Sequence, residues 1–239
     1  MDAVLRLGMF VLMSLSGGVL LMAVAARPLA NALDLKMEFV TQVMGFCSVQ
    51  GLALLWVSMF VGEHGLTWAG AFGFRRAPGR SAARAGVTML VVLPLTVLVL
   101  AGISTLLLHV FGMDPKSQLT VTFIKEHPPA WQLAVMGFTA IVLAPVAEEA
   151  LFRGVMYTTL KQRGYLRGAM FGNAALFAVI HFNLAALLPL FLLALVFTWL
   201  YERTGNLLAP IVAHMVFNAV NFAALVLDLP QWLEKMVNQ

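Results

Sequence analysis

Three ionisable residues lie close together in a part of the sequence that is otherwise apolar. Glu148, Glu149 and Arg153 fall in the segment APVAEEALFR (144–153), which continues an uncharged stretch from Pro128 to Ala147. Charged side chains inside a bilayer cost free energy, so they usually mark a functional site. Glu149 and Arg153 are four residues apart and share one helical face, so we assign them to a structural ion pair. Glu148 is turned about 100° away, which leaves its carboxylate available for chemistry.

The position of these charges along the predicted helix decides whether they are buried. If they lay at the end of the span, they would contact lipid head groups. Twelve residues separate Glu149 from Lys161, which corresponds to roughly 18 Å of helix and favours a position inside the membrane. Pro145 lies one turn before the acids, and its missing N–H leaves the backbone carbonyl of Ile141 without a donor. We therefore expect a kink next to the charged residues.

Two later apolar stretches each contain a histidine. His181 follows Phe177 by one helical turn, and His214, Asn218 and Asn221 form a polar stripe at positions i, i+4 and i+7. A single histidine in such a helix is typically an interhelical hydrogen-bonding residue. Together with two carboxylates and a guanidinium, these side chains could supply a general base, a proton carrier and hydrogen-bond donors for one site. No serine, threonine or cysteine lies in a recognisable nucleophile motif, so we expect activated water to be the nucleophile.

Three motifs follow one another along these predicted helices. They are Glu-Glu-x-x-x-Arg at 148–153, Phe-x-x-x-His at 177–181 and His-x-x-x-Asn at 214–218. In this order they resemble the CAAX protease and bacteriocin-processing (CPBP) family of membrane-embedded glutamate peptidases, which includes the eukaryotic CAAX prenyl protease. The resemblance covers about residues 131–222, and the first three predicted spans contribute only general character.

The resemblance implies an all-helical membrane endopeptidase that works without a metal or other cofactor. In this family the first glutamate of the pair and the histidine of the second motif activate water, which corresponds to Glu148 and His181 here. The histidine and asparagine of the last motif form the oxyanion hole, which corresponds to His214 and Asn218. The implied reaction is hydrolysis of a peptide bond in a membrane-associated peptide or protein.

The same residues permit other interpretations. Glu148, His181 and His214 could instead be zinc ligands with an open fourth position, although the chain has no His-Glu-x-x-His pattern. The protein could be a non-catalytic membrane immunity factor or scaffold that keeps the polar cluster for structure. Buried glutamate and histidine also occur in proton-coupled transporters, but we find no inverted repeat that would support transport.

The composition places these motifs in a membrane protein. Of 239 residues, 61% are hydrophobic and only 11% are charged, which is far too apolar for a soluble domain. Cys47 is the single cysteine, so neither an internal disulfide nor a cysteine-based zinc site is available. The net charge of +4 is small and no basic run is interleaved with aromatic residues, which argues against nucleic-acid binding.

Charge-free stretches indicate the transmembrane segments. Each is about long enough to cross a hydrocarbon core of about 30 Å, and the stretches are Leu7–Ala26, Phe39–Gly62, Ala85–Met113, Pro128–Ala147, Gly168–Tyr201 and Thr204–Leu227. The fifth is too long for one crossing, and Asn183 and Pro189 indicate a turn within it. We therefore predict an all-α, polytopic transmembrane bundle of about seven spans around a polar intramembrane cavity. Residues 1–239 would form a single integral membrane domain.

Basic residues between the spans predict the orientation. They concentrate in two loops, at 75–84 and 161–167, and basic loops are retained on the cytoplasmic side. This places the N-terminus in the cytoplasm and the C-terminus outside, most simply in a bacterial inner membrane. Besides the lipid bilayer, the expected partner is a peptide or protein substrate that reaches the site from the cytoplasmic leaflet.

Overall fold

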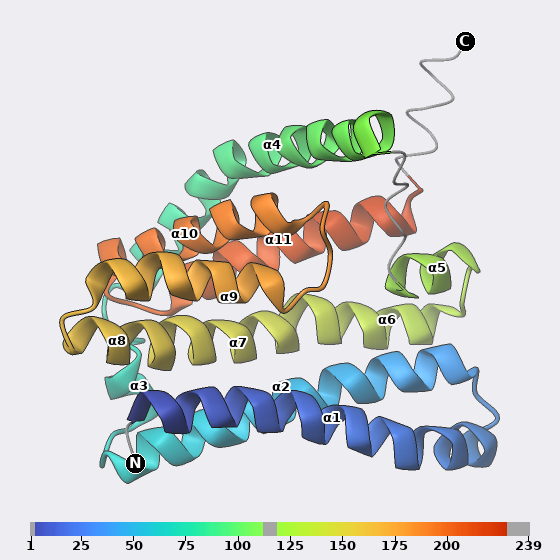
Figure 1. Cartoon of the computed structure of the whole chain (residues 1–239), viewed down its shortest axis with the longest axis horizontal. Helices are drawn as coiled ribbons and strands as arrows, with labels where there is room; N and C mark the ends of the chain where they lie inside the picture. The colour runs from blue at the N-terminus through green and yellow to red at the C-terminus, as the bar shows by residue number, and fades with distance from the viewer. Residues whose placement is uncertain (1–2, 112–118, 229–239) are drawn as a thin grey trace.

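The computed structural model describes residues 3–111 and 119–228, which form helices joined by short connections and contain no strand (Figure 1). In chain order these are α1 Ala3–Leu33, α2 Met37–Glu63, α3 Trp68–Ala71, α4 Pro78–Phe111, α5 Leu119–Lys125, α6 Ala130–Phe138, η1 Thr139–Leu143, α7 Ala144–Glu149, η2 Ala150–Tyr157, α8 Thr158–Gln162, η3 Gly168–Gly172, α9 Asn173–Val179, α10 Leu187–Thr204 and α11 Leu208–Val226. The three η segments are π-helical, with a wider winding than an α-helix. The elements from α6 to α8 form one continuous rod.

Six helical stretches among the described residues are long and apolar enough to cross a membrane. They are Ser16–Leu33, Met37–Glu63, Pro78–Leu100, Ala130–Gln162, Leu187–Thr204 and Leu208–Val226. A shorter apolar helix, Gly168–Val179, precedes the fifth of these spans. The chain turns between Val179 and Leu187, as predicted, and within this turn the Asn183 side chain accepts a hydrogen bond from the backbone N–H of Ala186 at 3.1 Å. The predicted helical membrane bundle of about seven spans is confirmed, while Met113 and the tail beyond Asp228 lie outside the described residues.

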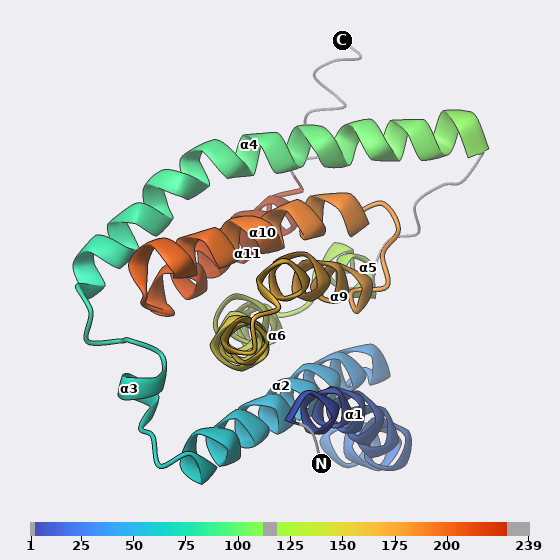
Figure 2. The same cartoon turned by 60° about the vertical axis from the view of Figure 1, so that its left-hand side comes forward.

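The α6–α8 rod lies in the middle of the bundle. The α1/α2 hairpin covers one side of it, and α9, α10 and α11 cover the other, with α4 outermost against α10 and α11 (Figures 1 and 2). Both α2 and α11 contact α7, the part of the rod that carries the two adjacent glutamates. The helices that carry the second and third motifs therefore lie against the rod that carries the first motif. Helix α2 contacts the same rod.

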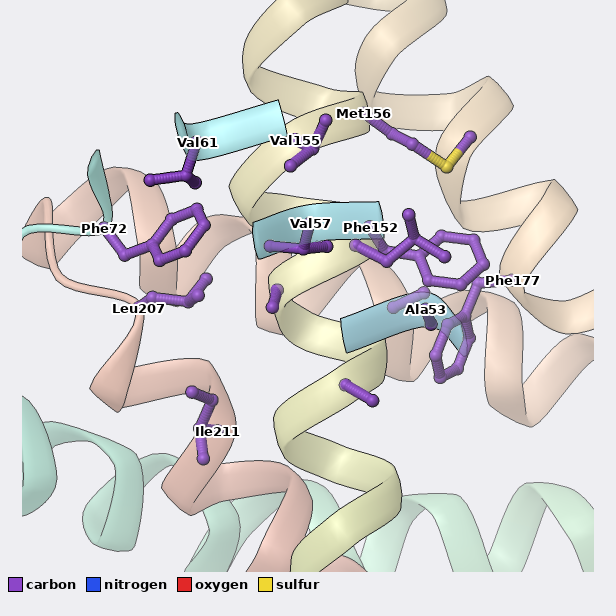
Figure 3. Close-up of a cluster of buried hydrophobic side chains, with 14 of the residues drawn as sticks. Ala53, Val57, Val61, Phe72, Phe152, Val155, Met156, Phe177, Leu207 and Ile211 are labelled. Atoms are coloured by element: carbon purple, nitrogen blue, oxygen red, sulfur yellow. The ribbon is translucent and has the colours of Figure 1, made fainter. Parts of the chain in front are cut away.

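The buried core that fixes this arrangement lies between α2 and the rod (Figure 3). Ala53 and Val57 of α2 pack in one cluster with Phe152 of the rod and Phe177 of α9. The Phe152 and Phe177 rings meet edge to face at 5.3 Å, a favourable arrangement for aromatic pairs. Because the polar residues belong to the same helices, the apolar contacts determine how closely those side chains approach.

Hydrogen bonds and ion pairs join the connections between the helices at each end of the bundle. At the end with the basic loops, Asn206 donates to the carbonyl oxygen of Arg76 at 2.8 Å, and Lys161 forms an ion pair with Glu202. At the other end, Lys36 and Glu126 form an ion pair at 2.7 Å. The hydrogen bond that Lys36 donates to Glu126 raises the pKa of Lys36 above its ordinary value. The two predicted basic loops thus share one end of the bundle, and which side of the membrane that end faces stays a prediction.

Gly154 of the rod packs directly against Phe72, the residue that follows α3. Phe72 is only 1% exposed, and a β-carbon at residue 154 would lie 2.5 Å from its ring. We expect Gly154→Ala to lower the free energy of unfolding by about 1–3 kcal/mol, as overpacking in a filled core does. Thermal unfolding of the protein in detergent measures the change.

Gly86→Ala in α4 is the matched control, because a β-carbon there has no neighbouring atom within 4 Å. Alanine is favoured over glycine inside a helix by about 1 kcal/mol, so this variant should be as stable as the unmodified protein or slightly more so. Equal melting temperatures for the two variants would contradict the packing described for Phe72.

Candidate active site

An irregular winding of the rod precedes the acidic pair. In the π-helical segment η1, the Ala144 N–H donates to the carbonyl oxygen of Thr139, five residues back. The next carbonyl, that of Ala140, would be paired with residue 145, but Pro145 has no N–H to donate. The Asn218 side chain of α11 donates to the Ala140 oxygen instead, at 2.8 Å. A residue of the third motif therefore bonds the carbonyl of Ala140, one residue before the Ile141 carbonyl expected from α-helical pairing, because the winding is wider here.

A second irregular segment follows the acidic pair. In η2 the carbonyl oxygen of Phe152 accepts a hydrogen bond from the Asn173 side chain at 3.0 Å, and that of Arg153 accepts one from the Thr158 hydroxyl at 2.9 Å. Asn173 lies on α9 and is 3% exposed. Polar side chains from two neighbouring helices thus support the backbone of the rod on either side of the glutamates.

Arg153 is fully buried, with no exposed surface. Its Nη1 donates to Glu149 Oε1 at 2.9 Å, and its Nη2 donates to the carbonyl oxygen of Ala194 in α10 at 3.0 Å. The guanidinium also lies 4.8 Å from the centre of the Phe177 ring and 5.3 Å from that of Phe197. Such cation–π contacts add to the ion pair in offsetting the cost of burial. The arginine joins the rod to both α9 and α10.

Glu149 contacts His214 as well as Arg153. His214 Nδ1 lies 3.0 Å from Glu149 Oε1, and the imidazole stacks on Phe197 at 4.9 Å. An ionised carboxylate only accepts hydrogen bonds, so the proton of this contact belongs to Nδ1. The opposite nitrogen, Nε2, lies 3.9 Å from Glu148 Oε2. One imidazole ring therefore lies between the two adjacent carboxylates.

Glu148 is the more accessible of the two acids, since its side chain is 16% exposed and that of Glu149 is 0% exposed. Its Oε1 accepts a hydrogen bond from Gln50 Nε2 in α2 at 3.0 Å. Its Oε2 is buried and has no hydrogen-bond partner among the described residues. The two oxygens thus differ, because one is held by an amide and the other is free to accept a proton.

His181 ends the second motif in the turn after α9. Its Nδ1 lies 2.6 Å from the carbonyl oxygen of Phe177, which only accepts hydrogen bonds, so Nδ1 carries the proton and Nε2 has the lone pair. The Phe177 ring lies 4.8 Å from the His181 ring and 5.9 Å from the His214 ring. The two imidazoles are therefore grouped around one phenylalanine.

The structure gathers five of the six predicted residues through direct contacts with one another or with Phe177. Asn218, one turn beyond His214, is joined to the rod through Ala140. Gln50 and Asn173 were missed by sequence reasoning. In both cases the sequence offers one signal of a buried polar contact, which is an amide side chain inside a charge-free span. The α2 span contains two glutamines, Gln42 and Gln50, and residue type alone does not say which one contacts Glu148.

The acids and imidazoles of the described part of the chain are not arranged as metal ligands. Within residues 3–111 and 119–228, no group of three His, Cys, Asp or Glu side chains is placed to hold a metal ion. Glu148, His181 and His214, the alternative zinc ligands considered above, therefore do not form such a group.

Comparisons with known proteins locate the similarity in the same part of the chain. The model of a family described as "Type II CAAX prenyl endopeptidase Rce1-like" matches residues 130–220, the segment that contains all three motifs. "Putative membrane peptidase YdiL" of Bacillus subtilis (strain 168) is 26% identical over 110 residues, which cover 46% of this chain and 44% of that protein. "Uncharacterized protein YpbD" of the same organism is 34% identical over 83 residues, covering 33% of this chain and 40% of the relative.

The chain thus spans less than half of the length of each of these relatives. No solved structure matches. The matched residues contain Glu148, Glu149, Arg153, His181, His214 and Asn218 in the order expected from the motifs. Residues 130–220 of this chain are therefore similar to the Rce1-like CAAX prenyl endopeptidases, in agreement with the resemblance that the three motifs carry.

Proposed function

We propose that this protein is an intramembrane endopeptidase that hydrolyses a peptide bond with water activated by Glu148. The observation that carries the proposal is the free Glu148 Oε2, which is buried without a hydrogen-bond partner among the described residues and lies 3.9 Å from His214 Nε2. A carboxylate oxygen in this setting can accept a proton from a water molecule. The description of YdiL as a membrane peptidase and the endopeptidase family match support the same reaction.

Glu148 and His181 share the acid–base work in this proposal. Glu148 takes a proton as the water oxygen attacks the scissile carbonyl, and the proton then passes to the leaving amine. The Nε2 of His181 has its lone pair available because Nδ1 is bonded to the Phe177 carbonyl. It can therefore orient the water or relay its proton.

His214 and Asn218 supply the hydrogen bonds for the developing oxyanion. One of the two amide protons of Asn218 is bonded to the Ala140 carbonyl, which fixes the side chain and leaves the second proton to donate. His214 holds one proton on Nδ1 against Glu149, and it donates from Nε2 when the ring is the imidazolium ion.

Glu149 and Arg153 act as a structural ion pair that orients His214 and does not touch the reacting atoms. The substrate is a membrane-associated peptide or protein that enters from the cytoplasmic leaflet, with the basic-loop end of the bundle in the cytoplasm of a bacterial cell. The reaction as proposed draws on protein side chains and requires no metal.

The first test replaces the proposed base. Glu148→Gln keeps the size of the side chain and an acceptor for Gln50 but removes the basic oxygen. We expect release of peptides to fall by at least about a hundredfold, which is typical for the loss of a general base. Mass spectrometry of peptides released in membranes that contain the unmodified or the variant protein measures this.

Glu202→Gln is the control for loss of a carboxylate, because Glu202 is partly exposed and pairs with Lys161 near the end of the bundle. Undiminished peptide release in Glu148→Gln at an equal protein level would remove Glu148 from the base role, and a biological function that survives this substitution would favour the immunity-factor or scaffold alternative. The same assay after exhaustive chelation tests the zinc alternative, and we expect activity to persist.

The second test concerns the oxyanion hole. We expect Asn218→Ala to lower kcat by a hundredfold or more, the usual effect of removing one oxyanion donor. Asn221→Ala is a matched control, since Asn221 lies on the same helix and bonds only within it, to Phe217, at 2.8 Å. Equal kcat values for the two variants would remove Asn218 from the oxyanion role.

The third test compares a buried with an exposed ion pair. Arg153→Met leaves Glu149 buried without its cation and should cost about 3–5 kcal/mol of unfolding free energy. Lys161→Met breaks the partly exposed pair with Glu202 and should cost at most about 1 kcal/mol. Unfolding in mixed detergent micelles gives both values, and similar losses would argue against Arg153 as a structural centre.

A further inference from the structure

We infer that Gln50 is a positioning residue for Glu148, so that the α1/α2 hairpin completes the site. The inference rests on the proposed function of Glu148. The contact is the hydrogen bond of 3.0 Å from Gln50 Nε2 to Glu148 Oε1, which joins residues 98 positions apart in the chain. Gln50 lies outside the family-matched segment 130–220, so the three motifs alone give no reason to expect it.

The packing of α2 directs Gln50 toward the rod. Gln50 falls on the same helical stripe as Ala53, Val57 and Val61, at spacings of three and four residues. These three are 4%, 1% and 3% exposed, and they belong to the core cluster that contains Ala147 and Phe152 of the rod (Figure 3). Gln50 is itself only 7% exposed. An amide therefore occupies a position where the rest of the stripe is apolar, and it faces the acid.

A neutral donor at this position has two effects on the carboxylate. It stabilises the ionised form by hydrogen bonding, and it fixes the side-chain torsions so that Oε2 is the oxygen left to accept a proton. Because an amide has no charge, it does not neutralise Glu148 as Arg153 neutralises Glu149. The amide thus orients Glu148 without cancelling its charge, and a general base requires such an orientation.

The kinetic test uses Gln50→Met, which keeps the length and volume of the side chain and removes the donor. Gln42→Met is the control, since Gln42 is another buried glutamine of α2. We expect Gln50→Met to lower kcat about tenfold or more at neutral pH with KM unchanged. The acidic limb of the kcat profile should move up by about one to two pH units, the size expected for a hydrogen bond to a charged group, and activity should recover as the pH is raised.

A structural role alone would lower the melting temperature without moving the acidic limb. The inference is overturned if Gln50→Met keeps both the kcat and the acidic limb of the unmodified protein, or if Gln42→Met shows the same shift.

An infrared titration separates this inference from the proposed function. The band of the protonated Glu148 carboxyl is identified by its loss in Glu148→Gln, and its midpoint should move to higher pH in Gln50→Met. If peptide release never depends on Glu148, the peptidase proposal fails, while a shifted midpoint still supports the action of Gln50 on the carboxylate. An unshifted midpoint overturns the inference whatever the activity.

Discussion

A guanidinium with no exposed surface must find all its partners inside the protein. The partners of Arg153 are Glu149 of its own helix, a backbone carbonyl of α10 and two aromatic faces, those of Phe177 on α9 and Phe197 on α10, while its Nε has no hydrogen-bond partner among the described residues. Removing any partner leaves a charge that lipid cannot solvate. The requirement therefore fixes the rod, α9 and α10 relative to one another more strictly than apolar packing would.

The proposed catalytic groups depend on the same contacts. Phe177 receives the arginine and also contacts both imidazoles, and Glu149 bonds both Arg153 and His214. The histidine that faces Glu148 is thus oriented by a carboxylate whose charge the arginine balances. The ion pair and the proposed base lie on different faces of one helix, and His214 connects them.

Sequence reasoning was sound where local spacing decides the outcome. The helical spans, the turn near Asn183 and the separation of Glu148 from Glu149 all follow from hydropathy and a period of 3.6 residues. Gln50 and Asn173 could not be assigned in this way, because their partners lie on other helices and depend on packing. The wider winding before Pro145 was also missed, so the carbonyl bonded by Asn218 could not be identified. A kink was expected at Pro145, but pairing across helices requires coordinates.

The short helix before His181 has a consequence for the lipid around the protein. Twelve residues from Gly168 to Val179 rise only about 18 Å, well short of a hydrocarbon layer of about 30 Å. A helix this short ends before it could cross such a layer, and in the turn that follows it the Asn183 side chain accepts a hydrogen bond from the backbone N–H of Ala186. Phe182, 87% exposed in this turn, is an apolar side chain that a surrounding lipid layer would cover, and it follows His181 directly in the chain.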